Sequence, residues 1–277
     1  MRGRALLGLL PLALYLLGFT LFPVASTLAL SLTAPEGGLT LEHFRRVAGH
    51  YQFGEAVTNT AAITGIGLAL ELVLGLATAL ALASRPAGRT VFQVLLLVPL
   101  GVPTIVAAAV MRTVFGTVGY LNEILLRLGA IRTPVNWVGE RGVALLTVAV
   151  ADAWKVTPLV MLILLAGLQA IPGELYEAAR TDGASRWRQF VAITLPLLKP
   201  ALSMALIVRG VDAFRIFALP LALAGRSLPV LSTYAYVEYL EYGNPNTAAA
   251  SSVILLVMIL IAVASYLKLA GPEEVLR

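Results

Sequence analysis

Long uncharged runs are the feature that most limits what this chain can fold into. Residues 5–35, 90–111 and 242–267 contain no Asp, Glu, Lys or Arg. Each run is long enough to cross the hydrocarbon core of a bilayer, which takes about 20 helical residues. Only 13% of the residues are charged, whereas a soluble domain carries roughly 25%. The sequence therefore predicts an all-α protein that crosses a membrane several times.

Six helices are expected to span the membrane, within a single domain over residues 1–277. Their approximate ranges are 5–32, 57–84, 90–111, 143–168, 198–222 and 248–268. Arg2 and Arg4 place the N-terminus on the cytoplasmic side, because short inner loops are enriched in Lys and Arg. Four crossings then return the segment 172–196 to the cytoplasm, and six return the C-terminus. The first run is about twice as long as the apolar core of a signal peptide, so we interpret it as a span.

An outer segment over residues 112–142 contains a predicted amphipathic helix. Glu123 and Arg127 are spaced to pair on its polar side, and Gly129 can end it. Its apolar face is formed, at the spacing of one helix side, by Leu121, Ile124, Leu125 and Leu128. We therefore expect this helix to lie in the outer interface of the membrane.

The residue types that are missing or scattered exclude several classes of site. There is no cysteine and there are only two histidines, His43 and His50, so no metal site is expected. No lysine follows a glycine, so the chain has no phosphate-binding P-loop and any ATP must bind another chain. The net charge of +5 is spread over many loops without an aromatic-flanked basic patch, so no nucleic-acid partner is expected.

The longest charge-dense segment, residues 172–196, predicts two short helices joined at a glycine. Pro172 suits the first turn of the first helix, because its missing N–H needs no partner there. Gly183 suits the left-handed residue that ends this helix, and Ser185 can cap the second one. The sequence therefore predicts a corner of fixed shape on the cytoplasmic side.

Ionisable side chains also fall within the expected spans, namely Glu71, Asp152, Lys155, Arg209, Asp212 and Arg215. Each costs about 2.5–3.5 kcal/mol at the bilayer centre if it is unpaired, so all should face protein or water. Asp152 and Lys155 are three residues apart on one helix and are expected to pair. Asp212 can pair with either arginine of the fifth span, which leaves one positive charge over.

Two interpretations of these charges stay open. They can line a polar path in which carboxylates, cations and aromatic faces bind a carbohydrate, or they can pair only with one another. The path interpretation gives the candidates Glu71, Asp152, Trp154, Lys155, Asp212, Phe214 and Arg215. Internal pairing is favoured for Glu71 and for Asp152 with Lys155, and neither interpretation is favoured for Asp212 and Arg215.

The charge-dense segment resembles the cytoplasmic EAA loop of permease subunits of binding-protein-dependent ABC importers. The family pattern is Glu-Ala-Ala, then Asp-Gly-Ala, then Ile-x-Leu-Pro. Here these positions are Glu177, Ala178, Ala179, Asp182, Gly183, Ala184, Ile193, Leu195 and Pro196. The resemblance implies that these residues dock on an ATPase, with Glu177 and Asp182 meeting basic groups there.

Further motifs are similar to the sugar-permease branch, above all to subunits for maltose, trehalose and related glucosides. They include Trp154-Lys155-x-x-Pro158 and the run from Arg209 through Asp212 to Phe217. Ala218 and Leu223-Ala224-Gly225 stand where family members often have an Asp and a Thr-Gly-Gly turn. The resemblance therefore implies a sugar cargo without specifying one sugar.

The resemblance implies the type I ABC importer permease fold, in the inner membrane of a prokaryote. Such a subunit imports its cargo, here a di- or oligosaccharide such as maltose or trehalose, by alternating access. It is not an enzyme and binds no cofactor, because Mg-ATP binds the ATPase chains. Its implied partners are a second permease, two copies of a cytoplasmic ATPase and an extracytoplasmic solute-binding protein. The alternatives are a glycerophosphodiester or polyol as cargo, or an ion-coupled secondary transporter that uses Glu71, Asp152 and Asp212 as a relay.

Overall fold

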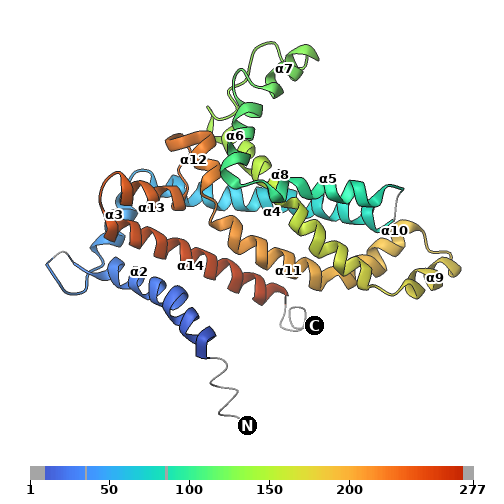
Figure 1. Cartoon of the computed structure of the whole chain (residues 1–277), viewed down its shortest axis with the longest axis horizontal. Coiled ribbons are helices and arrows are strands. Elements are labelled where there is room, and N and C mark those ends of the chain that lie inside the picture. The colour runs from blue at the N-terminus through green and yellow to red at the C-terminus, as the bar shows by residue number, and fades with distance from the viewer. Residues whose placement is uncertain (1–9, 35, 85–86, 271–277) are drawn as a thin grey trace, which may run out of the picture. The chain divides into compact units, whose positions relative to one another are not determined.

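The computed structural model describes residues 10–34, 36–84 and 87–270, and its regular elements are helices (Figure 1). Arg2, Arg4 and the expected start of the first span lie outside the described residues. Two compact units can be distinguished within the chain. One comprises residues 1–57 and 230–258, and the other comprises residues 58–229 and 259–277. Each unit has its own core.

The first unit is built around a small cluster of side chains from distant parts of the chain. Its elements are the π-helical turn η1 (Leu17–Leu21), α2 (Phe22–Leu32), α3 (Glu42–Gly49), the start of α4 (Phe53–Ala83), α13 (Leu231–Leu240) and the first half of α14 (Pro245–Ala270). The buried residues of its core are Val47, Ala56, Leu231, Tyr234 and Ala250. Asn246 donates hydrogen bonds to the carbonyl oxygens of Leu30 and Thr33, at 3.0 and 2.9 Å. This amide ties the start of α14 to the end of α2.

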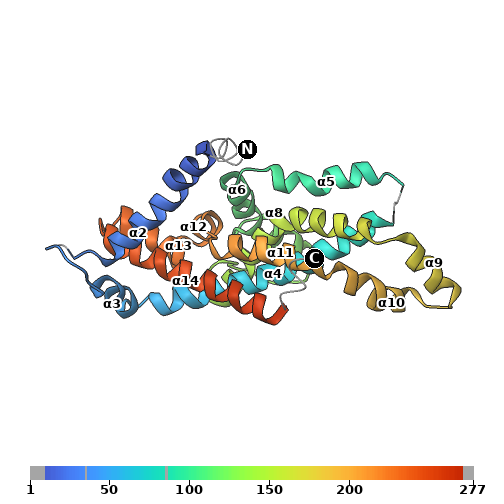
Figure 2. The same ribbon diagram turned by 90° about the horizontal axis from the view of Figure 1, so that it is seen from below.

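The second unit contains the remaining helices. They are α5 (Arg89–Gly101), α6 (Thr104–Phe115), α7 (Tyr120–Arg127), α8 (Arg141–Ala170), α9 (Gly173–Thr181), α10 (Arg186–Gln189), the π-helical turn η2 (Phe190–Thr194), α11 (Leu195–Phe214), α12 (Ala218–Ala224) and the 3-10 turn η3 (Gly225–Ser227), together with most of α4 and the end of α14. Helix α5 lies beside α8, as Figures 1 and 2 both show.

The core of the second unit joins α4, α8 and α11 through aliphatic side chains and glycines. Its buried residues are Ala79, Leu82, Val160, Met161, Leu164, Leu165, Leu198 and Ala205. A Cβ added to Gly75 would lie 2.7 Å from Val160 Cγ1, and one added to Gly167 would lie 2.6 Å from Ala201 Cβ. Any larger residue at these two positions would push the helices apart, so glycine is what allows this close packing.

Helical stretches long and apolar enough to cross a membrane occur six times among the described residues. They are Leu10–Leu32, Phe53–Ala83, Thr104–Arg127, Arg141–Ala170, Arg186–Phe214 and Pro245–Ala270. Many large apolar side chains on these helices are exposed, among them Phe19, Val73 and Ile261. Exposed apolar faces of this kind suit lipid, as expected of a multi-pass membrane protein.

The expected third span over residues 90–111 is wrong, because the structure divides it into α5 and α6. Val102 and Pro103 between them are extended, with ψ near 127° and 138°. The ring of Pro103 disfavours a helical conformation of the residue before it, so the helix ends at Gly101. The long apolar stretch instead begins at Thr104, and Arg89–Gly101 is a shorter apolar helix.

The expected fifth span over residues 198–222 is also interrupted. Helix α11 begins three residues earlier than predicted, at Leu195, and ends at Phe214, and α12 follows from Ala218. A helix that continued through this region would bring the ring of Pro220 against the carbonyl of Ile216, four residues before it. As the third residue of α12, the same proline needs no hydrogen-bond partner.

Candidate functional site

The segment between α8 and α11 forms an elbow of two short helices, α9 and α10. Helix α9 ends at Thr181, and Gly183, which follows the C-cap Asp182, has φ of +77°, in the left-handed region predicted for it. The N–H of Gly183 donates to the carbonyl of Arg180 at 3.0 Å, and the N–H of Ala184 donates to that of Ala179 at 2.8 Å. Ser185 caps α10, since its Oγ accepts the N–H of Arg188 at 3.3 Å. Pro172 is the N-cap of α9 rather than a residue of its first turn.

Side-chain contacts brace this elbow from within. The amide of Gln189 donates to the carbonyl of Ala184 at 2.9 Å. The hydroxyls of Tyr176 and Thr194 are hydrogen-bonded at 2.9 Å, which joins α9 to the π-helical turn η2 that leads into α11. Both short helices are therefore fixed to each other and to the start of α11.

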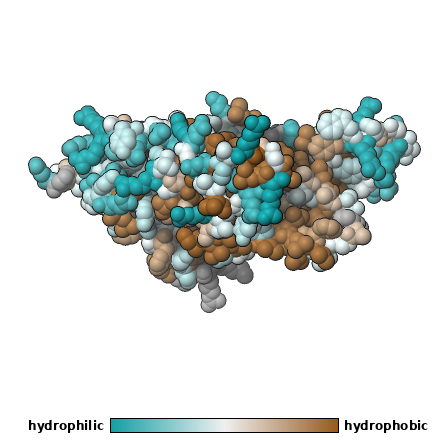
Figure 3. All heavy atoms as spheres, turned by 90° about the horizontal axis from the view of Figure 1, so that it is seen from above, coloured by the Kyte–Doolittle hydropathy of each residue, from teal (hydrophilic) through white to brown (hydrophobic). Residues whose placement is uncertain are grey.

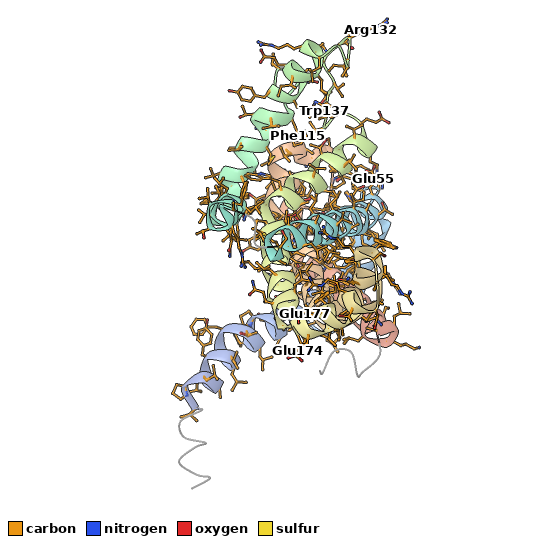
Figure 4. All side chains as sticks on the ribbon, turned by 90° about the vertical axis from the view of Figure 1, so that its right-hand side faces the viewer. Glu55, Phe115, Arg132, Trp137, Glu174 and Glu177 are labelled. Carbon is orange, nitrogen blue, oxygen red and sulfur yellow. The ribbon has the colours of Figure 1, made fainter. Side chains whose placement is uncertain are left out.

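The predicted docking residues lie mostly on the surface of the elbow. Glu177, Ala178, Asp182, Gly183, Leu195 and Pro196 are exposed, and Ala179, Ala184 and Ile193 are half-buried. Figure 3 shows the hydrophilic end of the second unit that carries α9 and α10. Figure 4 shows Glu174 and Glu177 close together on α9. The exposed acidic face and the two small alanines leave room for the backbone of another protein.

A polar cleft of about 260 Å³ lies beside the end of α11 in the second unit. Its lining residues are Thr104, Asp152, Lys155, Val156, Arg209, Asp212, Arg215, Ile216, Phe217, Ala218 and Leu219. It thus brings together four of the predicted path residues, namely Asp152, Lys155, Asp212 and Arg215. Trp154 and Phe214 do not line this cleft, and Phe214 instead lines a separate apolar pocket with Tyr266.

The charged side chains of the cleft are organised by Arg209, a residue that the sequence did not single out as a site residue. Its Nε and Nη2 donate to the two carboxylate oxygens of Glu71, at 2.8 and 3.0 Å. Nη2 also donates to Asp152 at 3.2 Å, and Nη1 donates to Asp212. The expected pairing of Asp152 with Lys155 is therefore wrong, because Asp152 is paired with Arg209. The expected surplus of positive charge on α11 is also offset, since carboxylates from α4 and α8 reach its arginine.

Non-helical backbone at the end of α11 forms part of the same cleft. Arg215 is the C-cap of α11, and Phe217 has φ near −134° and ψ near −61° before α12 begins. At membrane depth, irregular backbone is tolerated where it is buried in protein or lines a water-filled cavity. Ile216 and Phe217 line the cleft. The break in the span and the polar cavity therefore belong to one site.

The segment between α6 and α8, which was expected on the outer side, is held together by Asn122. Its amide donates to the carbonyl of Val135 at 2.8 Å and accepts from the indole N–H of Trp137 at 3.1 Å. The rings of Phe115 and Trp137 meet edge to face at 6.4 Å, whereas Arg132 lies at the far tip of the segment (Figure 4). Helix α7 itself was predicted, and its pair Glu123 with Arg127 is confirmed.

This fold, with a polar cleft at a broken span and a braced, charge-rich elbow, defines a multi-pass membrane transport component. The chain belongs to the family of binding-protein-dependent transport system inner membrane components, whose sequence profile matches residues 71–269. The predicted membership is confirmed. The alternative function of an ion-coupled secondary transporter is not needed to explain the buried carboxylates, because Arg209 pairs with them.

Named relatives and a solved structure agree with this family. The trehalose/maltose transport system permease protein MalF of Thermococcus litoralis is 38% identical, over 95% of this chain and 92% of that protein. The trehalose transport system permease protein SugA of Mycobacterium tuberculosis is 32% identical, over 98% of this chain and 89% of that protein. A chain of a bacterial alginate ABC transporter, in complex with an alginate pentasaccharide-bound periplasmic protein, has a TM-score of 0.87 at 22% identity, covering 99% of this chain and 96% of that chain.

The relatives are named as permease proteins, so this chain is a transport subunit of an ABC importer rather than an enzyme. The structural likeness shows that the fold is that of an ABC importer permease.

Proposed function

We propose that this chain moves a neutral sugar, a di- or oligosaccharide such as maltose or trehalose, through the cleft beside α11 by alternating access. The observation that carries the proposal is the polar cleft of about 260 Å³ at the break between α11 and α12. Carboxylates, an ammonium group and guanidinium groups line it, and such groups can hydrogen-bond many hydroxyls at once. The names of the relatives, which include trehalose and maltose, support a carbohydrate.

The charge balance at the cleft favours a neutral cargo. The acidic groups Glu71, Asp152 and Asp212 are matched in number by the basic groups Lys155, Arg209 and Arg215. The charge of an ionised cargo would itself find no surplus counter-charge among these groups, in a medium where an unpaired charge is costly. A glycerophosphodiester is therefore less well suited than a sugar, and a neutral polyol is the remaining alternative.

The driving force comes from other chains in this proposal. The complex contains two copies of a cytoplasmic ATPase, one of which binds α9 in a cleft where Glu177 and Asp182 meet basic groups, and Mg-ATP binds only to those chains. Closure of the ATPases pushes the braced elbow as a rigid lever, which tilts α11 and switches the side on which the cleft opens. A second permease completes the pathway, and an extracytoplasmic solute-binding protein delivers the sugar. The chain lies in the inner membrane of a prokaryote with both termini in the cytoplasm.

Uptake by the reconstituted complex tests this function. Asp212→Asn and Arg215→Gln should each lower sugar uptake about tenfold, because each removes a charged hydrogen-bond partner worth roughly 1.5–3 kcal/mol. Lys268→Gln is the matched control, since it removes a positive charge from the last turn of α14, outside the cleft lining. Uptake that is unchanged in both cleft variants would remove this cleft from the transport path.

The cargo itself can be identified separately. A panel of sugars, polyols and glycerophosphodiesters is added to the paired solute-binding protein, and its melting temperature is measured. The true cargo stabilises the protein by about 2.7 kcal/mol when present at a hundred times its dissociation constant. Stabilisation by a glycerophosphodiester and by no sugar would overturn the proposed cargo.

A further inference from the structure

The charged cluster consists of Asp212, Asp152, Arg209 and Glu71, and its side chains become less exposed from the cleft toward the interior. The side chain of Asp212 is 68% exposed and that of Asp152 is 13% exposed, whereas Arg209 is 2% exposed and Glu71 is fully buried. Asp152, Asp212 and Arg209 line the cleft, but Glu71 lies behind Arg209 and does not. Glu71 can therefore act on a bound molecule only through another residue.

The hydrogen bonds of Arg209 reach three helices at once. Glu71 is on α4, Asp152 is on α8, and Asp212 is on α11 itself. Glu71 accepts two parallel N–H groups, a forked contact that fixes the plane of the guanidinium as well as its position. With that plane fixed, the remaining N–H groups point at Asp152 and Asp212 in a set direction.

Neutralisation of charge alone does not explain this arrangement. Lys155 and Arg215 line the same cleft, and Lys155 is only three residues from Asp152, yet Asp152 and Asp212 are paired with Arg209. A lysine at position 209 would offer a single point charge, whereas the planar fork of arginine holds several carboxylates in one geometry. The arrangement therefore fixes the orientation of the Asp152 and Asp212 carboxylates in addition to balancing their charge.

We propose that Glu71 and Arg209 are a positioning pair for cargo recognition. Glu71 fixes the guanidinium of Arg209, and the guanidinium holds Asp152 and Asp212 so that their other lone pairs accept hydroxyl groups of the sugar. Arg209 thereby prevents the two carboxylates from turning toward Lys155 and Arg215, the other cations that line the cleft. This inference rests on the proposed function, since it assumes that the cleft holds the cargo.

The test measures the dissociation constant for trehalose of the complete importer in nanodiscs, without its binding protein. Glu71→Gln keeps the size of the side chain but weakens the fork, and Arg209→Lys keeps the charge but loses the planar geometry. Each should raise the dissociation constant about tenfold, the effect of losing one charge-assisted hydrogen bond. Melting temperature and copurification with the ATPase are measured on the same samples.

A double variant separates positioning from stability. Glu71→Gln with Arg209→Gln removes a buried acid and a buried base together, so no isolated charge is left buried. The proposal can therefore be tested with this double variant even if a single variant fails to assemble. We expect its melting temperature to be close to that of the unaltered complex while its dissociation constant stays at least tenfold higher. A double variant that binds trehalose as tightly as the unaltered complex overturns the proposal.

Two further variants keep this result distinct from the proposed function. Tyr266→Phe removes the hydroxyl that donates to Ser203 of α11 at 2.6 Å, outside the cleft, and should lower the melting temperature without changing the dissociation constant. Asp212→Asn should raise the dissociation constant. If Asp212→Asn raises it and the Glu71 and Arg209 variants do not, only the positioning pair is wrong. If none of them raises it, the cleft is not the cargo site and both proposals are wrong.

Discussion

The cleft and the elbow of the second unit contain the same kinds of charged residue in opposite settings. At the cleft, Arg209 and the Glu71 behind it are buried, and the guanidinium of Arg209 holds the carboxylates of Glu71, Asp152 and Asp212. On the elbow, Glu177, Asp182 and Arg188 are exposed. Burial obliges the first group to find partners within the chain, because an unpaired charge there is costly. Exposed charges need no partner for stability, so those of the elbow are available to another protein.

The contacts that stabilise the two regions differ as well. The cleft is held by side-chain ion pairs between helices, whereas the elbow is held by its backbone turn at Gly183, the cap at Ser185 and two side-chain hydrogen bonds. A substitution in the cleft should therefore mainly lower the stability of the fold. A substitution on the elbow should mainly lower the coupling of ATP hydrolysis to uptake. Variants in both regions test this distinction.

The largest effect on stability is expected at Arg209. Arg209→Met leaves Glu71 fully buried without its cation and should lower the free energy of unfolding by about 3–5 kcal/mol. Thermal unfolding of the purified chain in detergent measures the loss. The double variant Glu71→Met with Arg209→Met should recover most of it, because an apolar pair replaces a buried ion pair. A stable single variant would show that this cluster is not the structural centre of the unit.

An intermediate effect is expected at the corner of the elbow. Gly183 has φ near +77°, and a β-branched residue in that conformation costs about 1–2 kcal/mol. A Cβ there would meet no neighbouring atom, so the cost is one of backbone conformation alone. Gly183→Val should therefore lose coupled uptake while membrane insertion stays intact, and ATPase activity stimulated by the loaded binding protein measures the coupling. Gly183→Asn is the matched control, since asparagine tolerates the left-handed region and should keep most of the coupling.

The smallest effect on stability is expected at Glu177. Glu177→Gln removes an exposed charge, so the free energy of unfolding should change by less than about 0.5 kcal/mol. In the proposed complex, it should nevertheless weaken ATPase binding, which copurification at increasing salt measures. The distinction between the two regions fails if Glu177→Gln unfolds the chain or leaves the assembly as salt-resistant as before.

The sequence predicted the elbow well because its signals are local. A left-handed glycine and a serine cap act over three or four residues, so Gly183 and Ser185 could be assigned from their neighbours alone. The cleft was predicted only in part. The partners of Arg209 are 138 residues away at Glu71 and 57 residues away at Asp152, and no pattern in one sequence indicates which of several buried charges meet.

The breaks in two spans were missed although their cause is visible in the sequence. Pro103 lies within the uncharged run 90–111, and Pro220 lies within the uncharged stretch 216–225. Prolines are tolerated in membrane helices where neighbours satisfy the freed carbonyl groups, so the presence of a proline alone does not predict that a helix ends there. Pro158 lies inside α8 without ending it. Three-dimensional surroundings, which the sequence does not reveal, decide which proline ends a helix.

The π-helical turn η2 between the elbow and α11 has a consequence for the orientation of the elbow. The N–H of Leu195 bonds to the carbonyl of Phe190, five residues back, so this turn holds one more residue than a regular α-helical turn. Because each residue of an α-helix advances the chain by about 100° around the axis, deleting one residue here would swing α9 through about that angle relative to α11. The length of this short connection thus sets the azimuth of α9 around the axis of α11.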